Sequence, residues 1–385
     1  MQSIFTSLTR HRLTISLFLL SFVAQGAFAD HIHHITHNTS GWFDQDLTAL
    51  TGATLPNPAT GVTAFATTSD NHLHAFYATT DQHVHQLSFN NTSWTDQDLT
   101  ALANGPIALG LGGIASFATG SQLHVFYIGN DLHIHQLFSN GANWGDQDLT
   151  VLAGGPVTDF DSLVAFQTIP NHQFHVYYLA NNSNDLHELN FKSNTWSDQD
   201  LRTVANAPPS DRGWMAGFAT GNQEHLFFTG FSPRDKRHME HLFFNGTKWA
   251  NQDVTAKVHA LPVNPGSAIA AFAVNGSQLE AYGVTNDQDV HQFTFKSGHW
   301  SDEDLTALAG QMDFGIGGMA AFRTLPDNQF HLFYSPNDLD QLFFDGTNWT
   351  DIDLTTLTGG GIPNGPGGMA GFAIKTVQHG FYVAQ

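Results

Sequence analysis

The chain has 385 residues, of which 34 are Asp or Glu and 13 are Lys or Arg; its formal charge is −21 and it contains no cysteine. Without cysteine there are no disulfide bonds and no thiolate zinc sites, and so negative a surface repels the phosphates of nucleic acids, so we expect no nucleic-acid partner. The content of 36 Gly and 32 Phe with only 12% charged residues favours short strands joined by tight turns over helices.

The first 29 residues predict a secretory signal peptide. Arg10 and Arg12 precede an apolar run, LTISLFLLSFVAQ, and Ala27 to Ala29 form a small-x-small cleavage site. The apolar run is too short to span a membrane, and no later run approaches that length. We therefore predict cleavage before Asp30, which removes two arginines and leaves an exported chain with a formal charge of −23 and no membrane span. An uncleaved anchor is the alternative.

Internal repetition then dominates the chain. Seven of the eight tryptophans recur at intervals of 49 to 53 residues, and a version of Asp-Gln-Asp-Leu-Thr follows each of them. Three more segments recur in every period, exemplified by TAFATT, LHAFYAT and HVHQLSF, and an Asn-Gly or Asp-Gly turn often separates the third from the tryptophan. One period therefore predicts four short strands, a to d, in a meander. The seven tryptophans are Trp42, Trp94, Trp144, Trp196, Trp249, Trp300 and Trp349.

Four strands repeated radially with such a period form the blade of a β-propeller. The chain after the predicted leader begins with a c and a d strand, DHIHHITHNTSGWFDQDLT, and it ends with an a and a b strand, GGMAGFAIKTVQHGFYVAQ. We predict an all-β fold, a seven-bladed propeller in one domain, 30–385, whose ring closes by pairing these two ends. A linear solenoid is the alternative, but it should show polar caps. The longer b–c connection at Phe228 to Leu242 is expected to be a solvated loop.

Each c strand places two polar residues on one face, because strand side chains alternate. Histidine exchanges with Asp at the first position and with Asp or Glu at the second, which favours hydrogen bonds to a neighbouring strand, with the Asp-x-Asp pair of strand d as the partner. A metal site is the alternative, since His-x-His presents two imidazoles on one side, but no third ligand stands out and we expect no cofactor. The first position holds His31, His83, His133, Asp185, His238, Asp289 and Asp338, and the second holds His33, His85, His135, His187, Glu240, His291 and Asp340.

Catalysis is not predicted. An active site is usually one constellation of unlike residues, whereas every candidate here recurs in nearly every period. No Gly-x-Ser-x-Gly or His-Glu-x-x-His motif occurs. Repeated polar and aromatic sets suit a multivalent binding protein, because several weak sites on one body give avidity. An enzyme that uses one divergent blade, for example a glycan hydrolase or lyase, stays an alternative.

The repeat resembles the propeller lectins of fungi and bacteria, through a polar residue in an aliphatic and aromatic b strand, a Gln or Glu on strand c, and a tryptophan after the c–d turn. In the fucose-binding lectins an arginine on b, a glutamate on c and a tryptophan near d form the sugar pocket. This chain has histidine in place of the arginine, and neutral imidazole donates one hydrogen bond where guanidinium donates two. The resemblance therefore implies glycan or glycoconjugate partners without implying fucose specificity.

Carried over blade by blade, the resemblance implies four sets of sugar-binding residues. Glu280 replaces the basic residue in a fifth set, with Gln292 and Trp300. The tryptophans have an alternative role as core residues between blades, because they bury a large area. The four sets are His74, Gln86 and Trp94; His124, Gln136 and Trp144; His175, Glu188 and Trp196; and His331, Gln341 and Trp349.

Overall fold

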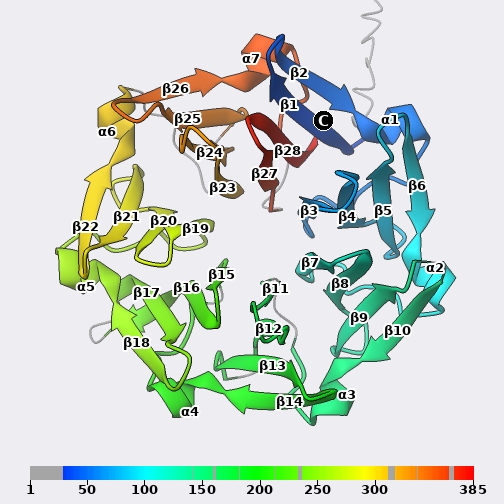
Figure 1. Cartoon of the computed structure of the whole chain (residues 1–385), viewed down its shortest axis with the longest axis horizontal. Helices are drawn as coiled ribbons and strands as arrows, with labels where there is room; N and C mark the ends of the chain where they lie inside the picture. The colour runs from blue at the N-terminus through cyan, green and yellow to red at the C-terminus, as the bar shows by residue number, and fades with distance from the viewer. Residues whose placement is uncertain are drawn as a thin grey trace, which may run out of the picture.

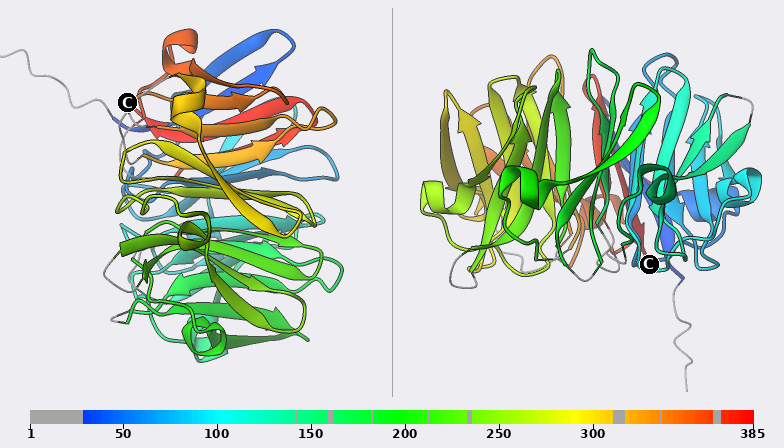
Figure 2. Two further views of the ribbon diagram at one scale, coloured as in Figure 1. Left: turned by 90° about the vertical axis from the view of Figure 1, so that its left-hand side faces the viewer. Right: turned by 90° about the horizontal axis from the view of Figure 1, so that it is seen from below.

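The structure, a computed structural model, describes residues 29–141, 143–158, 162–181, 183–211, 213–232, 236–310, 317–335, 337–363 and 368–385. Most of the predicted leader, residues 1–28, lies outside the described residues. Seven four-stranded antiparallel sheets stand around a central axis as the blades of a propeller (Figure 1). In Figure 2 the ring is seen from the side, with the strands running between its two faces. The predicted seven-bladed fold is thus confirmed.

Each blade contributes its a strand to the centre of the ring and its d strand to the rim (Figure 1). Blade 1 contains β3 (Val62–Ala66), β4 (Leu73–Ala78), β5 (Val84–Phe89) and β6 (Trp94–Asp98). Blade 2 contains β7 (Ile114–Thr119), β8 (Gln122–Ile128), β9 (Ile134–Ser139) and β10 (Trp144–Asp148). Blade 3 contains β11 (Val164–Gln167), β12 (Phe174–Leu179), β13 (Leu186–Lys192) and β14 (Thr195–Asp200).

The next three blades repeat this order. Blade 4 contains β15 (Ala216–Thr220), β16 (Gln223–Ser232), β17 (Lys236–Phe244) and β18 (Trp249–Asp253). Blade 5 contains β19 (Ile269–Asn275), β20 (Gln278–Val284), β21 (Val290–Lys296) and β22 (His299–Asp304). Blade 6 contains β23 (Met319–Arg323), β24 (Phe330–Tyr334), β25 (Asp340–Phe344) and β26 (Trp349–Asp353).

Blade 7 joins the two ends of the described chain. Its sheet order is β2 (Gly41–Asp46), β1 (His31–Asn38), β28 (Val377–Ala384) and β27 (Ala370–Ile374). Strand β1 pairs antiparallel with β28, from His31 opposite Ala384 to His37 opposite Gln378. This pairing satisfies strand edges that would otherwise be open.

A five-residue helix follows every d strand, where the sequence predicted that the strand would continue through Leu and Thr. The second Asp of each Asp-x-Asp pair is the N-cap, and its carboxylate accepts a hydrogen bond from a backbone N–H in the first turn, as Asp98 does from Ala101 at 2.9 Å. A residue in the left-handed conformation ends each helix, for example Gly154 at φ 68°. The helices are α1 (Leu47–Thr51), α2 (Leu99–Ala103), α3 (Leu149–Ala153), α4 (Leu201–Ala205), α5 (Val254–Val258), α6 (Leu305–Ala309) and α7 (Leu354–Thr358).

The expected solvated loop at Phe228 to Leu242 is instead the end of a long hairpin. Strands β16 and β17 stay paired as far as Ser232 opposite Lys236. Arg237 forms an ion pair with Asp211 and lies over the ring of Phe231, so this cation is held against the protein surface. Arg234 lies outside the described residues. No helix in the described ranges is long and apolar enough to cross a membrane.

Candidate functional site

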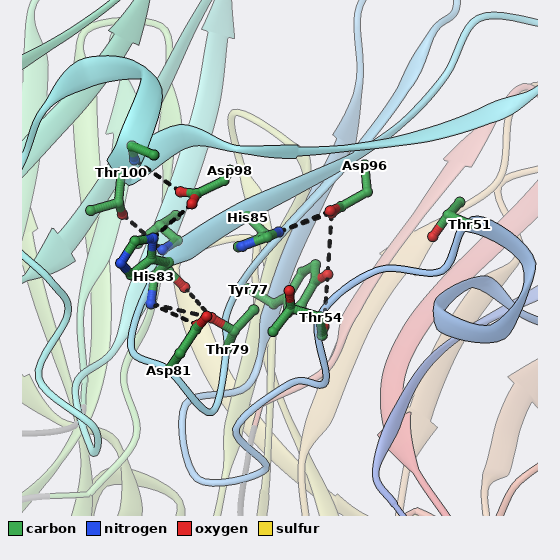
Figure 3. Close-up of polar contacts among 12 residues, drawn as sticks. Thr51, Thr54, Tyr77, Thr79, Asp81, His83, His85, Asp96, Asp98 and Thr100 are labelled. Atoms are coloured by element: carbon green, nitrogen blue, oxygen red, sulfur yellow. Dashed lines mark hydrogen bonds and ion pairs between the residues drawn. The ribbon is translucent and has the colours of Figure 1, made fainter.

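A polar network fastens strand c to strand d and to the following helix, and blade 1 shows it fully (Figure 3). His83 Nδ1 donates to Asp98 at 2.7 Å, and His85 Nδ1 donates to Asp96 at 3.0 Å. Thr100 Oγ1 accepts a hydrogen bond from the backbone N–H of Val84 at 2.8 Å. The Asp-Gln-Asp-Leu-Thr motif therefore has a structural role. Its two carboxylates accept hydrogen bonds from two imidazoles, its Leu packs in the core, and its Thr accepts a hydrogen bond from a buried backbone N–H.

Other blades repeat these contacts, which confirms Asp-x-Asp as the partner of the c-strand histidines. The first histidine bonds the second Asp in His31–Asp46, His133–Asp148 and His238–Asp253. The second histidine bonds the first Asp in His33–Asp44, His135–Asp146, His187–Asp198 and His291–Asp302.

In two blades a carboxylate replaces a c-strand histidine, and a new donor faces it. Asp185 takes the first position in blade 3 and accepts a hydrogen bond from Arg202 at 2.5 Å, and this arginine stands where other blades have the motif threonine. Glu240 takes the second position in blade 4 and faces Asn251, which replaces the first Asp and donates to it at 2.8 Å. Burial raises the pKa of Glu240 to about 8 despite that hydrogen bond.

A second set of polar pairs joins strands b and c, and it contains the residues predicted to bind sugar. Gln86 Nε2 lies 2.8 Å from His74 Nδ1, and the same contact joins Gln136 to His124. The remaining blades vary the chemistry but keep a polar pair. These pairs are His175–Glu188, His225–His241, Glu280–Gln292, His331–Gln341 and His34–His379.

The sequence predicted that each tryptophan lies beside the b–c pair of its own blade. In the structure it does not. Trp94 packs edge-on against Phe381 of blade 7, and Trp249 packs against Tyr177 of blade 3, at ring distances of 6.0 and 6.3 Å. Each tryptophan of strand d therefore lies on the preceding blade. The physical reason is that the b–c pair and the d-strand tryptophan project from opposite faces of the same sheet.

The structure thus regroups the predicted residues across blade interfaces. His124 and Gln136 of blade 2 line a pocket of about 620 Å³ with Trp196 of blade 3, and not with Trp144. By the same relation Trp144 packs in the core between blades 1 and 2, on the side of Phe76, and Trp349 packs on Tyr282 of blade 5. Two further pockets repeat the arrangement, one between blades 7 and 1 at His34, His379 and Trp94, and one between blades 3 and 4 at Glu188 and Trp249.

The tryptophans take the core role that the sequence left open, and their role as a platform for a ligand stays a prediction. Trp196 and Trp349 are 6% and 8% exposed and are mainly core residues. The other five are only partly buried. Part of each of these five side chains is therefore exposed to solvent, although each ring also packs on the preceding blade.

The pairs differ in charge. Burial lowers the pKa of His74, His124 and His331 to about 4, so these imidazoles are neutral at pH 7. Burial acts in the same direction on His175, but its hydrogen bonds with Glu188 and Glu224 outweigh it and raise the pKa of His175 to about 9. Glu224 was not among the residues predicted from the sequence. The available signal was an acidic residue directly before the b-strand histidine, where blades 1, 2, 3, 5 and 6 have Leu or Phe.

Comparisons with known proteins give structural neighbours only. No protein-family model and no curated protein sequence matches the chain. A structure of Aleuria aurantia lectin in complex with Fucα1-6GlcNAc has a TM-score of 0.54 at 14% identity, covering 76% of this chain and 94% of that one. BP39L lectin from Burkholderia pseudomallei has a TM-score of 0.60 at 16% identity, covering 81% and 89%, and AofleA from Arthrobotrys oligospora has 0.51 at 12%, covering 77% and 86%. These three solved structures are propeller lectins of fungi and bacteria, and the likeness establishes the propeller fold.

Proposed function

We propose that this protein is a carbohydrate-binding protein, a lectin without enzymatic activity, whose sites lie in the pockets between adjacent blades. The observation that carries the proposal is the repeated pocket in which a buried polar pair from one blade faces a tryptophan from the next. Amide and imidazole groups hydrogen-bond sugar hydroxyls, and the aromatic face covers the apolar side of a sugar ring. The neighbouring structures are lectins, which agrees with this chemistry.

The neutral pairs favour a neutral sugar. His124 with Gln136 and His74 with Gln86 present no full charge at pH 7, because burial keeps the imidazoles unprotonated. The arginine of the fucose-binding lectins has no counterpart at these positions, so we propose no specificity for fucose. Several such pockets on one rigid ring would bind a multivalent glycan with avidity.

A glycan array probed with residues 30–385 tests this function, followed by calorimetry with the best monovalent ligand. Gln136→Ala should remove one site from the measured stoichiometry, whereas Arg202→Thr, an exposed change next to the c–d network, should remove none. A folded protein that binds no glycan on a broad array would refute the lectin proposal.

We further propose that the protein is exported and that residues 1–29 are removed. The basis is the charged start, apolar run and Ala27–Ala29 triplet of the sequence. Amino-terminal sequencing of the protein recovered outside the producing cell should begin at Asp30, and an uncleaved terminus would contradict the proposal.

A further inference from the structure

The interface between blades 3 and 4 contains a buried cluster of His175, Glu188 and Glu224, from β12, β13 and β16. Their exposed fractions are 0%, 1% and 4%. His175 Nδ1 lies 2.7 Å from Glu188 Oε1 and 3.1 Å from Glu224 Oε2. One possible ligand atom from each residue lies within 4.8 Å of the other two. The three side chains thus converge on a single point.

The chain contains a neutral counterpart of this cluster between blades 6 and 7. There His331 lies 3.3 Å from Gln341 Nε2, and that amide donates to Gln378 at 2.7 Å. Gln341 and Gln378 occupy the positions of Glu188 and Glu224. Two amides are therefore sufficient to build this kind of interface, and the two carboxylates between blades 3 and 4 are not required for packing. A protonated imidazole balances only one of two buried carboxylates, so two carboxylates beside one imidazole are unfavourable unless a further positive charge compensates for the second.

Surrounding groups hold the cluster in a fixed orientation. The other ring nitrogen of His175, Nε2, lies 3.0 Å from the hydroxyl of Thr168, which is itself fully buried. Asn190 donates to Glu188 at 2.9 Å, and the Tyr177 hydroxyl donates to Glu224 at 2.5 Å. Protein metal sites are built in this way: an oxygen partner fixes the remote nitrogen of the ligating histidine, and hydrogen bonds orient the carboxylates.

The cluster also has a route to solvent. Glu188 and Glu224 line a pocket of about 670 Å³ together with Asn190 and Trp249. Lys192 and Lys248 stand on the wall of the same pocket, but both are exposed, and neither forms an ion pair with these carboxylates among the residues that the structure describes. The compensating charge therefore does not come from a neighbouring lysine.

We propose that this cluster is a binding site for a divalent transition-metal ion in the Mn²⁺ to Zn²⁺ range. His175 Nδ1 and one oxygen from each of Glu188 and Glu224 supply three ligands of types that these ions accept. A neutral imidazole and two carboxylates balance the two positive charges of the ion. A fourth position faces the pocket, where water or a hydroxyl group of a bound ligand completes the coordination. The site does not depend on the lectin function.

Calorimetric titration of residues 30–385 with Zn²⁺ alone tests the proposal. The wild type should bind one ion that the Glu188→Gln, Glu224→Gln double variant binds at least about 100-fold more weakly, because two ligands are lost. This variant should fold, since it reproduces the amide pattern between blades 6 and 7, and circular dichroism verifies that it does. Glu280→Gln is the matched control: it removes a fully buried carboxylate at another blade interface, where Gln292 rather than histidine is the partner.

Weaker Zn²⁺ binding at other histidines, such as the group of Asp131, His133, His135 and Asp148, is common to the wild type and both variants and cancels in the comparison. Co²⁺ gives a second readout, because its visible absorption reports coordination by protein ligands. Co²⁺ absorption present in the wild type and the Glu280→Gln control but absent from the double variant supports the site. Equal Zn²⁺ affinity and stoichiometry in the wild type and the double variant, or no tight ion in either, overturns it.

Discussion

Replacing Gln136 by glutamate turns the neutral b–c pair of blade 2 into a pair like that of blade 3. In the wild type, the Gln136 amide donates to His124 Nδ1 at 2.8 Å, so Nδ1 carries no proton. A carboxylate can only accept, as Glu188 does from His175, and therefore requires a proton on Nδ1. Burial holds the pKa of His124 at about 4, whereas that of His175 is about 9 with two carboxylates beside it. We expect the pKa of His124 in Gln136→Glu to rise above 6.5.

The substitution should also reverse the pH dependence that this residue gives to stability. An unfolded histidine has a pKa of about 6.5, so wild-type His124 contributes stability above pH 6.5 that is lost as the pH falls through about 4. The difference between a pKa of about 6.5 in the unfolded chain and about 4 in the folded chain corresponds to at most about 3 kcal/mol of stability. With a folded pKa above 6.5, the contribution is instead complete below pH 6.5 and is lost as the pH rises. As the pH falls from 6.5 to 4.5, the free energy of unfolding of the variant should therefore rise relative to that of the wild type.

Two measurements check this prediction: NMR titration of the His124 ring and urea unfolding at pH 4.5, 5.5 and 6.5. Gln147→Glu is the control, because Gln147 lines the same pocket on β10 and has no hydrogen bond to His124 among the contacts that the structure describes. A His124 pKa that stays near 4 in Gln136→Glu would refute the reasoning. An equal rise in Gln147→Glu would also refute it, since the charge alone would then account for the effect.

Three further substitutions test the c–d network by urea unfolding. Thr150→Val leaves the buried backbone N–H of Ile134 without its acceptor at 2.9 Å and should lower the free energy of unfolding by about 1–3 kcal/mol; an unchanged value would contradict the role given to the motif threonine. Arg202→Thr breaks an exposed ion pair and should change that free energy by less than about 1 kcal/mol. A larger loss would contradict the small contribution expected of an exposed ion pair. Asn251→Asp places a second carboxylate against Glu240, whose pKa is about 8, and should destabilise more at pH 9 than at pH 6, because Glu240 loses its proton in between; equal losses at both values would argue against a protonated Glu240.

The sequence predicted the blade count and the partners of the c-strand histidines because both follow from the repeat. Two incomplete ends that sum to one blade imply a closed ring, and a polar position that tolerates His, Asp and Glu implies a hydrogen-bonded network. The short helices were missed although their signals were present. Asp98 as N-cap and Asn104 in the left-handed conformation enclose only five residues, and so short a segment has no amphipathic period to reveal it.

The residues predicted to form each sugar pocket do not lie together within one blade, and the reason is geometric. Repeats align positions along one chain, and alternation assigns side chains to two faces of a strand. Neither indicates which neighbouring blade covers which face. His124 and Trp144 belong to one sheet, yet the ring of Trp144 lies with Phe76 of blade 1, while His124 faces Trp196 of blade 3. Only the ring arrangement determines that grouping.

Two exchanges in the c–d network are each matched by a second exchange. Arg202 accompanies Asp185, and Asn251 accompanies Glu240, so both exchanges keep a donor opposite an acceptor. Glu224 has no such match at the interface between blades 3 and 4, because its neighbour Glu188 is acidic as well and a single imidazole lies beside both. An excess of buried negative charge is expected where a ligand supplies the positive charge. This mismatch is the reason that the interface between blades 3 and 4, and not the more numerous His-x-His strands, is where a metal ion is to be sought.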